Sequence, residues 1–289
     1  MLPNINNQNH LYCPTLTMVD HTPSNLDLSC PPLQNFYNIN DIRLEKFKKV
    51  VGKYEIKPEY CLKLRQLEGF EIVFLCDDSG SMSTIIDDTN PFGKKMSRWD
   101  ELKNIVNVTM EIATALDRSG IDIYFLNREP LYNVNDSLLV EHIFDCGPKG
   151  YTPLVSALNR IYKEKEKVIN ERKMLLIIAT DGEPTNEYNF VDINDFINCL
   201  ENRPKNIYVS IVACTDDKKS IYYLDDIDKE IKNVDVNDDY NTELMQIKKV
   251  QGTKYKFSFG DYITKIMLGP IDSYFDNLDE KRDKGCIIL

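Results

Sequence analysis

The segment FEIVFLCDDSGSM, residues 70–82, joins a short apolar run to an acidic turn rich in hydroxyl groups. Apart from Glu71, residues 70–76 are apolar and partly β-branched, which predicts a strand that is buried on both faces. Strands of this kind belong to parallel sheets that are covered by helices on each side. In such sheets ligands bind beyond the carboxyl ends of the strands, so the residues that follow each strand are the candidates for function.

Strands and helices alternate along the rest of the chain. The clearest helix is 98–118, where apolar residues recur at the i, i+3, i+4, i+7 spacing and Gly120 is expected to close the helix. The other predicted strands are 121–126, 174–180, 207–214 and 255–259. The other predicted helices are 42–51, 60–67, 153–168, 191–200, 220–230, 242–250 and 261–267, and residues 137–144 form a short helix or an edge element.

This alternation predicts an α/β fold, doubly wound, with a mostly parallel central sheet flanked by helices. We expect one domain over residues 41–275, with a helical extension at its start, and a C-terminal tail over 276–289. Residues 1–40 hold eight Asn and five Pro but no Lys or Arg, and they lack apolar periodicity. They are therefore expected to form a flexible or extended segment.

Composition excludes several classes of protein. The 289 residues are 42% hydrophobic and carry a net charge of −11, which is typical of a globular chain and unfavourable for nucleic-acid binding. The apolar runs fall far short of the ~18 residues that a membrane-spanning helix needs. The N-terminus has no secretory pattern. The eight cysteines include no Cys-x-x-Cys pair, so we expect reduced thiols, no zinc site and a cytoplasmic location.

Five oxygen-bearing residues follow strands or precede a helix. Asp77, Ser79 and Ser81 come directly after the first strand and alternate, so their side chains point the same way. Asp181 follows the strand 174–180, and Thr152 lies in a Gly-rich loop that leads into a helix. Oxygen ligands without thiolate or imidazole select hard cations, so the set predicts a site for Mg²⁺, or for Mn²⁺ or Ca²⁺.

Three sequence motifs together resemble the von Willebrand factor A domain. They are the Asp77-x-Ser79-x-Ser81 turn, Thr152 in its Gly-x-Thr-Pro-Leu loop, and Thr180-Asp181-Gly182. The resemblance covers about residues 67–270 and implies a Rossmann-like fold with a metal-ion-dependent adhesion site. It implies that Ser79, Ser81 and Thr152 are direct ligands, that Asp77 and Asp181 act largely through water, and that a carboxylate of a partner completes the coordination.

The surroundings of the motif add detail. The run Asp-Asp-Ser-Gly-Ser-Met and the Arg98-Trp99-Asp100 that opens the next helix resemble intracellular members of that family rather than integrins. The other acids near the motif are expected to form a solvated acidic rim, or less readily a second cation site: Asp78, Asp87, Asp88 and Glu183.

The chain ends in Cys286-Ile287-Ile288-Leu289, which fits a C-terminal prenylation box, and the terminal Leu favours geranylgeranyl on Cys286. The alternative to a prenylation signal is an ordinary frayed C-terminal tail. If the lipid is attached, the protein is expected at the cytosolic face of a membrane.

We therefore expect a cation-dependent binding module, not an enzyme, whose protein partner presents Asp or Glu to the metal. One alternative is a Mg²⁺-dependent hydrolase or phosphoryl-transfer enzyme. It lacks support because no nucleophile elbow and no Walker motif is present and His142 is the only histidine of the predicted domain. Another alternative is a scaffold in which the metal is purely structural.

Overall fold

The computed structural model describes residues 34–87, 95–117, 119–186, 188–215 and 217–279. The chain divides into two units, Met1–Ile39 and Asn40–Leu289, and the sheet and its covering helices belong to the second. The predicted limits of the domain, at residues 41 and 275, stay a prediction. The prenylation box and the residues 1–33 lie outside the described residues.

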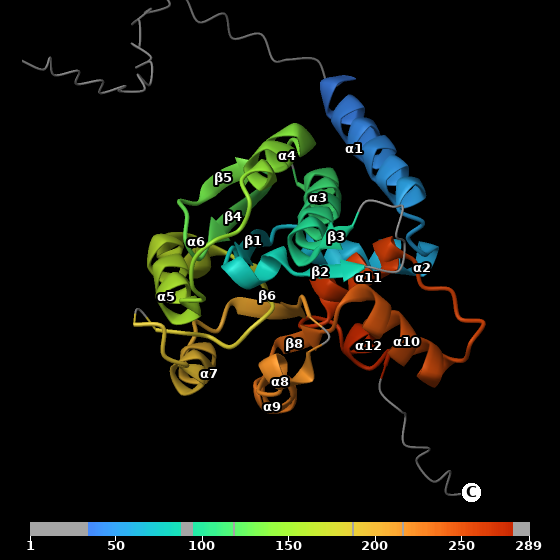
Figure 1. Ribbon diagram of the computed structural model, residues 1–289. Helices are drawn as coiled ribbons and strands as arrows, with labels where there is room; N and C mark the ends of the chain where they lie inside the picture. Colours follow the sequence, from blue (N-terminus) through green and yellow to red (C-terminus); the bar gives the residue numbers. More distant parts are fainter. Residues whose placement is uncertain (1–33, 88–94, 118, 187, 216, 280–289) are drawn as a thin grey trace, which may run out of the picture. The chain divides into compact units, whose positions relative to one another are not determined.

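A six-stranded sheet forms the centre of the second unit, in the order β5-β4-β1-β6-β7-β8 (Figure 1). All neighbouring strands are parallel except β5, which pairs antiparallel with β4 at one edge. The strands are β1 (Glu71–Cys76), β4 (Ile121–Phe125), β5 (Leu131–Val134), β6 (Met174–Thr180), β7 (Ile207–Ala213) and β8 (Val234–Asn237). A separate two-stranded ribbon joins β2 (Ile85–Asp87) to β3 (Met96–Ser97). The predicted mostly parallel sheet is thus confirmed.

Helices cover both faces of the sheet, and alternate residues of β1 show why. Ile72, Phe74 and Cys76 belong to one apolar cluster, whereas Val73 and Leu75 belong to the other. The first cluster includes residues of α3 (Arg98–Leu116), α4 (Ser137–Asp145), α10 (Tyr240–Gln251) and α11 (Phe259–Leu268). The second includes residues of α5 (Leu154–Glu164), α6 (Glu166–Glu171), α7 (Ile193–Glu201), α8 (Lys218–Ile221) and α9 (Leu224–Glu230). A doubly wound α/β fold follows from this two-sided burial.

Four short helical segments and one long helix complete the described elements. The long helix is α1 (Gln34–Lys53). The short ones are α2 (Pro58–Leu64), the 3₁₀ turn Arg65–Leu67 after it, and α12 (Ser273–Asp276). A further 3₁₀ turn, Gly80–Ser83, follows β1. Among the described residues, no helix combines the length and the apolar character that crossing a bilayer requires.

The predicted last strand is wrong. Residues 255–258 form no strand, and α11 begins at Phe259. The sixth strand is instead β8, whose Asp235 and Asn237 are buried. The Nδ2 of Asn237 donates to Ser210 Oγ at 3.3 Å, and Lys265 of α11 donates to Asn237 Oδ1 at 3.1 Å. Because polar residues face the interior here, the apolar pattern that marks a buried strand is missing.

Other predicted boundaries also shift. The helix expected over 153–168 is interrupted at Lys165, which ends α5 and places its ammonium between Glu71 and Asp122. The helix expected to close at Gly120 already ends at Leu116, and Gly120 (φ +83°) serves the turn into β4. The ambiguous segment 137–144 is a helix, α4, and the strand β5 before it was not predicted.

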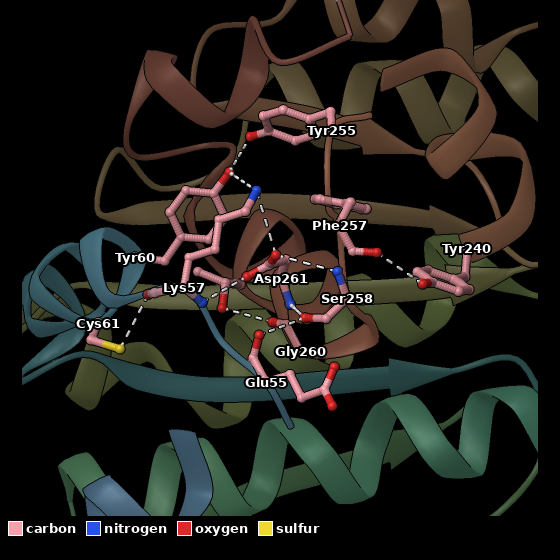
Figure 2. Close-up of polar contacts among 11 residues, drawn as sticks. Glu55, Lys57, Tyr60, Cys61, Tyr240, Tyr255, Phe257, Ser258, Gly260 and Asp261 are labelled. Atoms are coloured by element: carbon pink, nitrogen blue, oxygen red, sulfur yellow. Dashed lines mark hydrogen bonds and ion pairs between the residues drawn. The ribbon is translucent and has the colours of Figure 1, made fainter. Parts of the chain in front are cut away.

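A polar clasp ties the segment before α2 to the start of α11 (Figure 2). The Asp261 carboxylate accepts hydrogen bonds from the backbone N–H of Lys57 at 2.9 Å and of Ser258 at 3.2 Å. The Lys57 ammonium lies 3.5 Å from the same carboxylate and 3.8 Å from the centroid of the Tyr255 ring. The Tyr60 and Tyr255 hydroxyls are 2.9 Å apart. These contacts hold residues 255–258 in an irregular segment that ends in the cap of α11, Ser258, rather than in a strand.

Candidate metal site

The candidate site lies where β1 and β6 end side by side. The two strands are parallel neighbours in register from Glu71↔Met174 to Cys76↔Ala179, so their carboxyl ends meet at the same edge of the sheet. The pairing continues one step further, because the Asp77 N–H donates to Ala179 O at 2.9 Å. This register brings the turn that follows β1 against Thr180 and Asp181, as the sequence predicts.

Asp77 is fully buried and both of its carboxylate oxygens accept hydrogen bonds. The Ser79 N–H donates to Oδ1 at 2.8 Å, and the Thr180 hydroxyl donates to Oδ2 at 2.7 Å. Burial raises the pKa of Asp77 to about 6; the charge of Asp181 adds to the rise, and the bonds from Ser79 and Thr180 oppose it. The carboxylate therefore supports the turn and supplies negative charge behind it.

Ser79, Ser81 and Asp181 form one continuous contact chain. The two serine hydroxyl oxygens are 2.9 Å apart, and the Ser81 hydroxyl donates to Asp181 Oδ1 at 2.7 Å. Adjacent oxygen ligands of an octahedral Mg²⁺ shell, at about 2.0–2.1 Å from the ion, are themselves about 2.9 Å apart. The spacing of the two hydroxyl oxygens thus fits two neighbouring coordination positions on a hard cation. The carboxylates lie beside these two positions.

Thr152 reaches this edge through a loop that is bonded to the β1 turn. The backbone N–H of Lys149 donates to Asp78 O at 2.6 Å, and Gly80 N–H donates to Gly150 O at 3.3 Å. Thr152 also exchanges two bonds with Thr185 of the loop after β6: Thr152 N to Thr185 Oγ1 at 3.2 Å and Thr185 N to Thr152 O at 2.9 Å. Within the described residues, the Thr152 hydroxyl makes no hydrogen bond to the other four predicted ligands.

Arg98 is a member of the site that sequence reasoning missed. It is the first residue of α3, and its guanidinium donates to Asp181 Oδ2 at 2.7 Å and to Thr215 Oγ1 at 2.6 Å. The Arg98 side chain is 13% exposed and that of Asp181 is wholly enclosed, so this ion pair is shielded from water. The available signal was a basic residue that opens the helix directly after the hydroxyl-rich turn.

Asp78 was expected to belong to a solvated acidic rim. This prediction is wrong, because Asp78 is fully buried. Its Oδ1 accepts from the backbone N–H of Asn127 at 2.8 Å and from the Asn127 amide at 2.9 Å, and Arg128 Nε lies 2.9 Å from Oδ2. The same Asn127 amide donates to Tyr151 O at 2.9 Å. Asp78 therefore anchors the loop that carries Thr152, and its charge is cancelled by Arg128.

The predicted metal ligands at this edge are hydroxyl and carboxylate oxygens, which is the chemistry that suits a hard cation. The described residues contain no group of three or more His, Cys, Asp or Glu side chains that could hold a metal ion. The predicted set depends instead on two serines and a threonine beside two acids. The five cysteines among the described residues are free.

The similarity of the chain to known proteins is distant. No protein-family model matches the chain, and no curated protein matches its sequence. Among solved structures, the chain is similar to the manganese-loaded TRAP protein of Plasmodium vivax, with 16% sequence identity and a TM-score of 0.39 over 61% of this chain and 71% of that one. At this level of similarity, a function has to be argued from the side chains of the site.

Proposed function

We propose that the chain is a divalent-cation-dependent binding module of the von Willebrand factor A type. Ser79, Ser81 and Thr152 would hold Mg²⁺ directly, and Asp77 and Asp181 would support it from behind. A Mg²⁺ ion held mainly by neutral hydroxyls keeps an open, electrophilic position that a carboxylate can fill. The partner is accordingly a protein that presents an Asp or Glu side chain, and binding rather than turnover is the function.

The observation that carries the proposal is the hydroxyl pair of Ser79 and Ser81. The oxygens are 2.9 Å apart, and Asp181 holds Ser81 at 2.7 Å. Two hydroxyls beside buried carboxylates at the carboxyl edge of a parallel sheet support a site for a cation and its ligand. A hydrolytic role has less support, because neither a nucleophile elbow nor a Walker motif occurs in the sequence.

Localisation forms the second part of the proposal. Geranylgeranyl on Cys286 would place the module on the cytosolic face of a membrane, where a partner is captured through the cation. One lipid chain binds a membrane reversibly, so contact through the metal with a partner at the membrane would reinforce it.

Metal binding is tested first, with the purified full-length chain and Mn²⁺ as the probe. Ser79→Ala/Ser81→Ala removes both hydroxyls and should weaken Mn²⁺ binding by a factor of about ten or more. Ser83→Ala is the matched control, because it removes an exposed hydroxyl from the same 3₁₀ turn and should leave the affinity unchanged. Equal affinity in the wild type and the double variant would overturn the assignment of these ligands.

Partner capture is tested next, by affinity purification from a cell lysate in Mg²⁺ or in EDTA, with mass spectrometry as the readout. We expect a partner that is lost both with EDTA and with the double serine variant. A set of partners that is indifferent to both would mean that the metal is structural. Turnover of a generic phosphatase substrate that depends on Ser79 and Ser81 would favour the enzymatic alternative.

A further inference from the structure

The Arg98–Asp181 ion pair raises a question of charge at the candidate site. Arg98 extends from the first turn of α3, and its guanidinium contacts both Asp181 and Thr215, which belong to different strand ends. Its Nε is buried and has no hydrogen-bond partner among the described residues. The guanidinium is therefore held at Asp181 although one of its donors remains unsatisfied.

The formal charges near the site can be counted from the contacts. Asp77 and Asp181 each carry one negative charge when ionised, and Arg98 carries one positive charge. Asp78 lies close by, but Arg128 cancels it. Asp77, Asp181 and Arg98 thus sum to about −1, and a divalent cation would bring the site to about +1. Without Arg98, the two carboxylates and the divalent cation together would sum to zero.

Two other acids lie near Arg98 but do not pair with it. Glu101 and Asp239 line a cavity of about 260 Å³ together with Arg98. Neither forms an ion pair with Arg98, whose nearest carboxylate partner is Asp181 Oδ2. The guanidinium therefore acts on the carboxylate that also holds Ser81.

We infer that Arg98 sets the ligand preference of the site: it neutralises Asp181, weakens cation binding by the protein alone, and leaves a positive charge that an external carboxylate neutralises. This inference rests on the proposed function and adds a specificity-determining residue to it. Arg98 acts through Asp181 and is a positioning residue. Cation and acidic partner then bind cooperatively, since each makes the site more favourable for the other.

The physical reason is that the two carboxylate oxygens of Asp181 have different partners. Oδ1 accepts the Ser81 hydroxyl, and Oδ2 is held by the guanidinium. If the guanidinium is removed, Oδ2 becomes available to a cation, and the repulsion between a cation and Arg98 disappears. Unit charges a few ångström apart in a partly buried site change an equilibrium by a factor of about ten or more.

The test is a Mn²⁺ titration of the full-length wild type, Arg98→Gln and Arg98→Met. We expect both variants to bind Mn²⁺ about tenfold more tightly than the wild type. Arg98→Lys retains the charge and should stay within about twofold of the wild type. Arg172→Gln is the matched control: it removes an arginine that pairs with Glu71 at the amino end of the sheet, so the affinity should not change.

Acetate provides a second readout that a merely structural role would not move. We expect acetate to increase the apparent Mn²⁺ affinity of the wild type and of Arg98→Lys, and to lose this effect in Arg98→Gln. Thermal unfolding identifies which variants fold. If both neutral variants fail to fold, Arg98→Lys and acetate carry the test: Arg98→Lys must then match the wild type in both readouts.

The outcomes separate this inference from the proposed function. Wild-type binding of Mn²⁺ together with unchanged or weaker binding by Arg98→Gln overturns the role of Arg98 and leaves the metal site standing. An Arg98→Lys variant that binds Mn²⁺ as tightly as Arg98→Gln also overturns it, because charge would then not be the cause. A wild type that binds no Mn²⁺ overturns the proposed function, and the inference with it.

Discussion

At the scale of single residues, the acids at the carboxyl edge of the sheet differ in what offsets their charge. Asp77 has hydroxyl and backbone donors, Asp78 has Arg128 and Asn127, and Asp181 has Arg98 and Ser81. Buried carboxylates of this kind need such partners, because an unpaired buried charge is costly. The three neighbouring acids therefore have separate tasks: one supports the turn, one anchors a loop, and one faces the hydroxyls.

Gly150 is the residue on which the Thr152 loop depends. Its φ is +120°, and a Cβ there would lie 2.3 Å from the Asn127 side-chain oxygen. Gly150→Ala should therefore lower the free energy of unfolding by roughly 2–4 kcal/mol and weaken Mn²⁺ binding, because Asn127 also holds Asp78. Urea unfolding and a Mn²⁺ titration measure both effects.

Gly147→Ala is the matched control in the same loop. A Cβ at Gly147 would have no heavy atom within 4 Å, and its φ is not in the left-handed region. We expect a change of less than about 0.5–1 kcal/mol and unaltered Mn²⁺ binding. Equal effects of the two substitutions would contradict the role given to the backbone of Gly150.

Glu101 predicts a pH dependence of stability. Burial raises its pKa from 4.5 to about 7, the charge of Asp239 adds to the rise, and a bond from the Tyr240 backbone opposes it. Between pH 4.5 and pH 7 the folded state therefore binds this proton more tightly than the unfolded state does. Stability contributed by the protonated group is present below pH 4.5 and is lost as the pH rises through about 7.

Glu101→Gln mimics the protonated form and should remove this part of the pH dependence. We expect the variant to match the wild type closely at pH 4.5 and to be more stable by roughly 3 kcal/mol at pH 7.5. Urea unfolding at several pH values measures the difference. Glu166→Gln, on the exposed surface, serves as control and should keep the wild-type profile. A constant difference between Glu101→Gln and the wild type at all pH values would rule out the raised pKa.

At the scale of elements, apolar periodicity is a good guide where the core is apolar and fails where the interior is polar. β1 and β6 were predicted almost to the residue because, apart from Glu71 and Thr180 at their ends, they consist of apolar residues buried on both faces. β8 was missed because two of its three buried residues, Asp235 and Asn237, are polar, and Asn237 bonds to side chains of β7 and α11. Such bonds join residues far apart in sequence, so no local sequence pattern predicts them.

The clasp between α2 and α11 makes the same point and carries a prediction. Asp261 belongs to a capping box with Ser258 and also bonds Lys57 through backbone and ammonium. Asp261→Ala leaves the Lys57 ammonium without its carboxylate and the helix without part of its cap. The free energy of unfolding should fall by roughly 2–4 kcal/mol, as measured by urea unfolding.

Asp136→Ala is the comparison for the loss of a cap alone. Asp136 caps α4 by accepting from Leu138 N–H at 2.9 Å and is exposed. Its removal should cost about 1 kcal/mol. A loss at Asp261 no larger than this would mean that the contacts to Lys57 add nothing to stability.

At the scale of the whole molecule, the sheet topology explains how much of the site could be predicted. Parallel neighbours end at one edge, so Asp77, Ser79, Ser81 and Asp181 could be expected to meet. Arg98 could not, because it reaches the site by the packing of α3 against the sheet and by the length of its side chain. The sequence pattern thus indicates candidate oxygens, and tertiary packing decides which charges balance them.

The net charge of −11 leads to a prediction about membranes. Near the C-terminus, Lys281, Arg282 and Lys284 are offset by Asp279, Glu280 and Asp283, so this stretch would give no basic support to the proposed lipid on Cys286. Anionic lipid surfaces repel an acidic protein within a Debye length, which is about 8–10 Å at physiological salt.

The geranylgeranylated chain should therefore bind neutral phosphatidylcholine vesicles better than vesicles rich in phosphatidylserine, and added salt should reduce the difference. Vesicle co-sedimentation measures this, with Cys286→Ser as the unlipidated control that should stay in the supernatant. Stronger binding to the anionic vesicles would show that attraction at another surface outweighs the net charge.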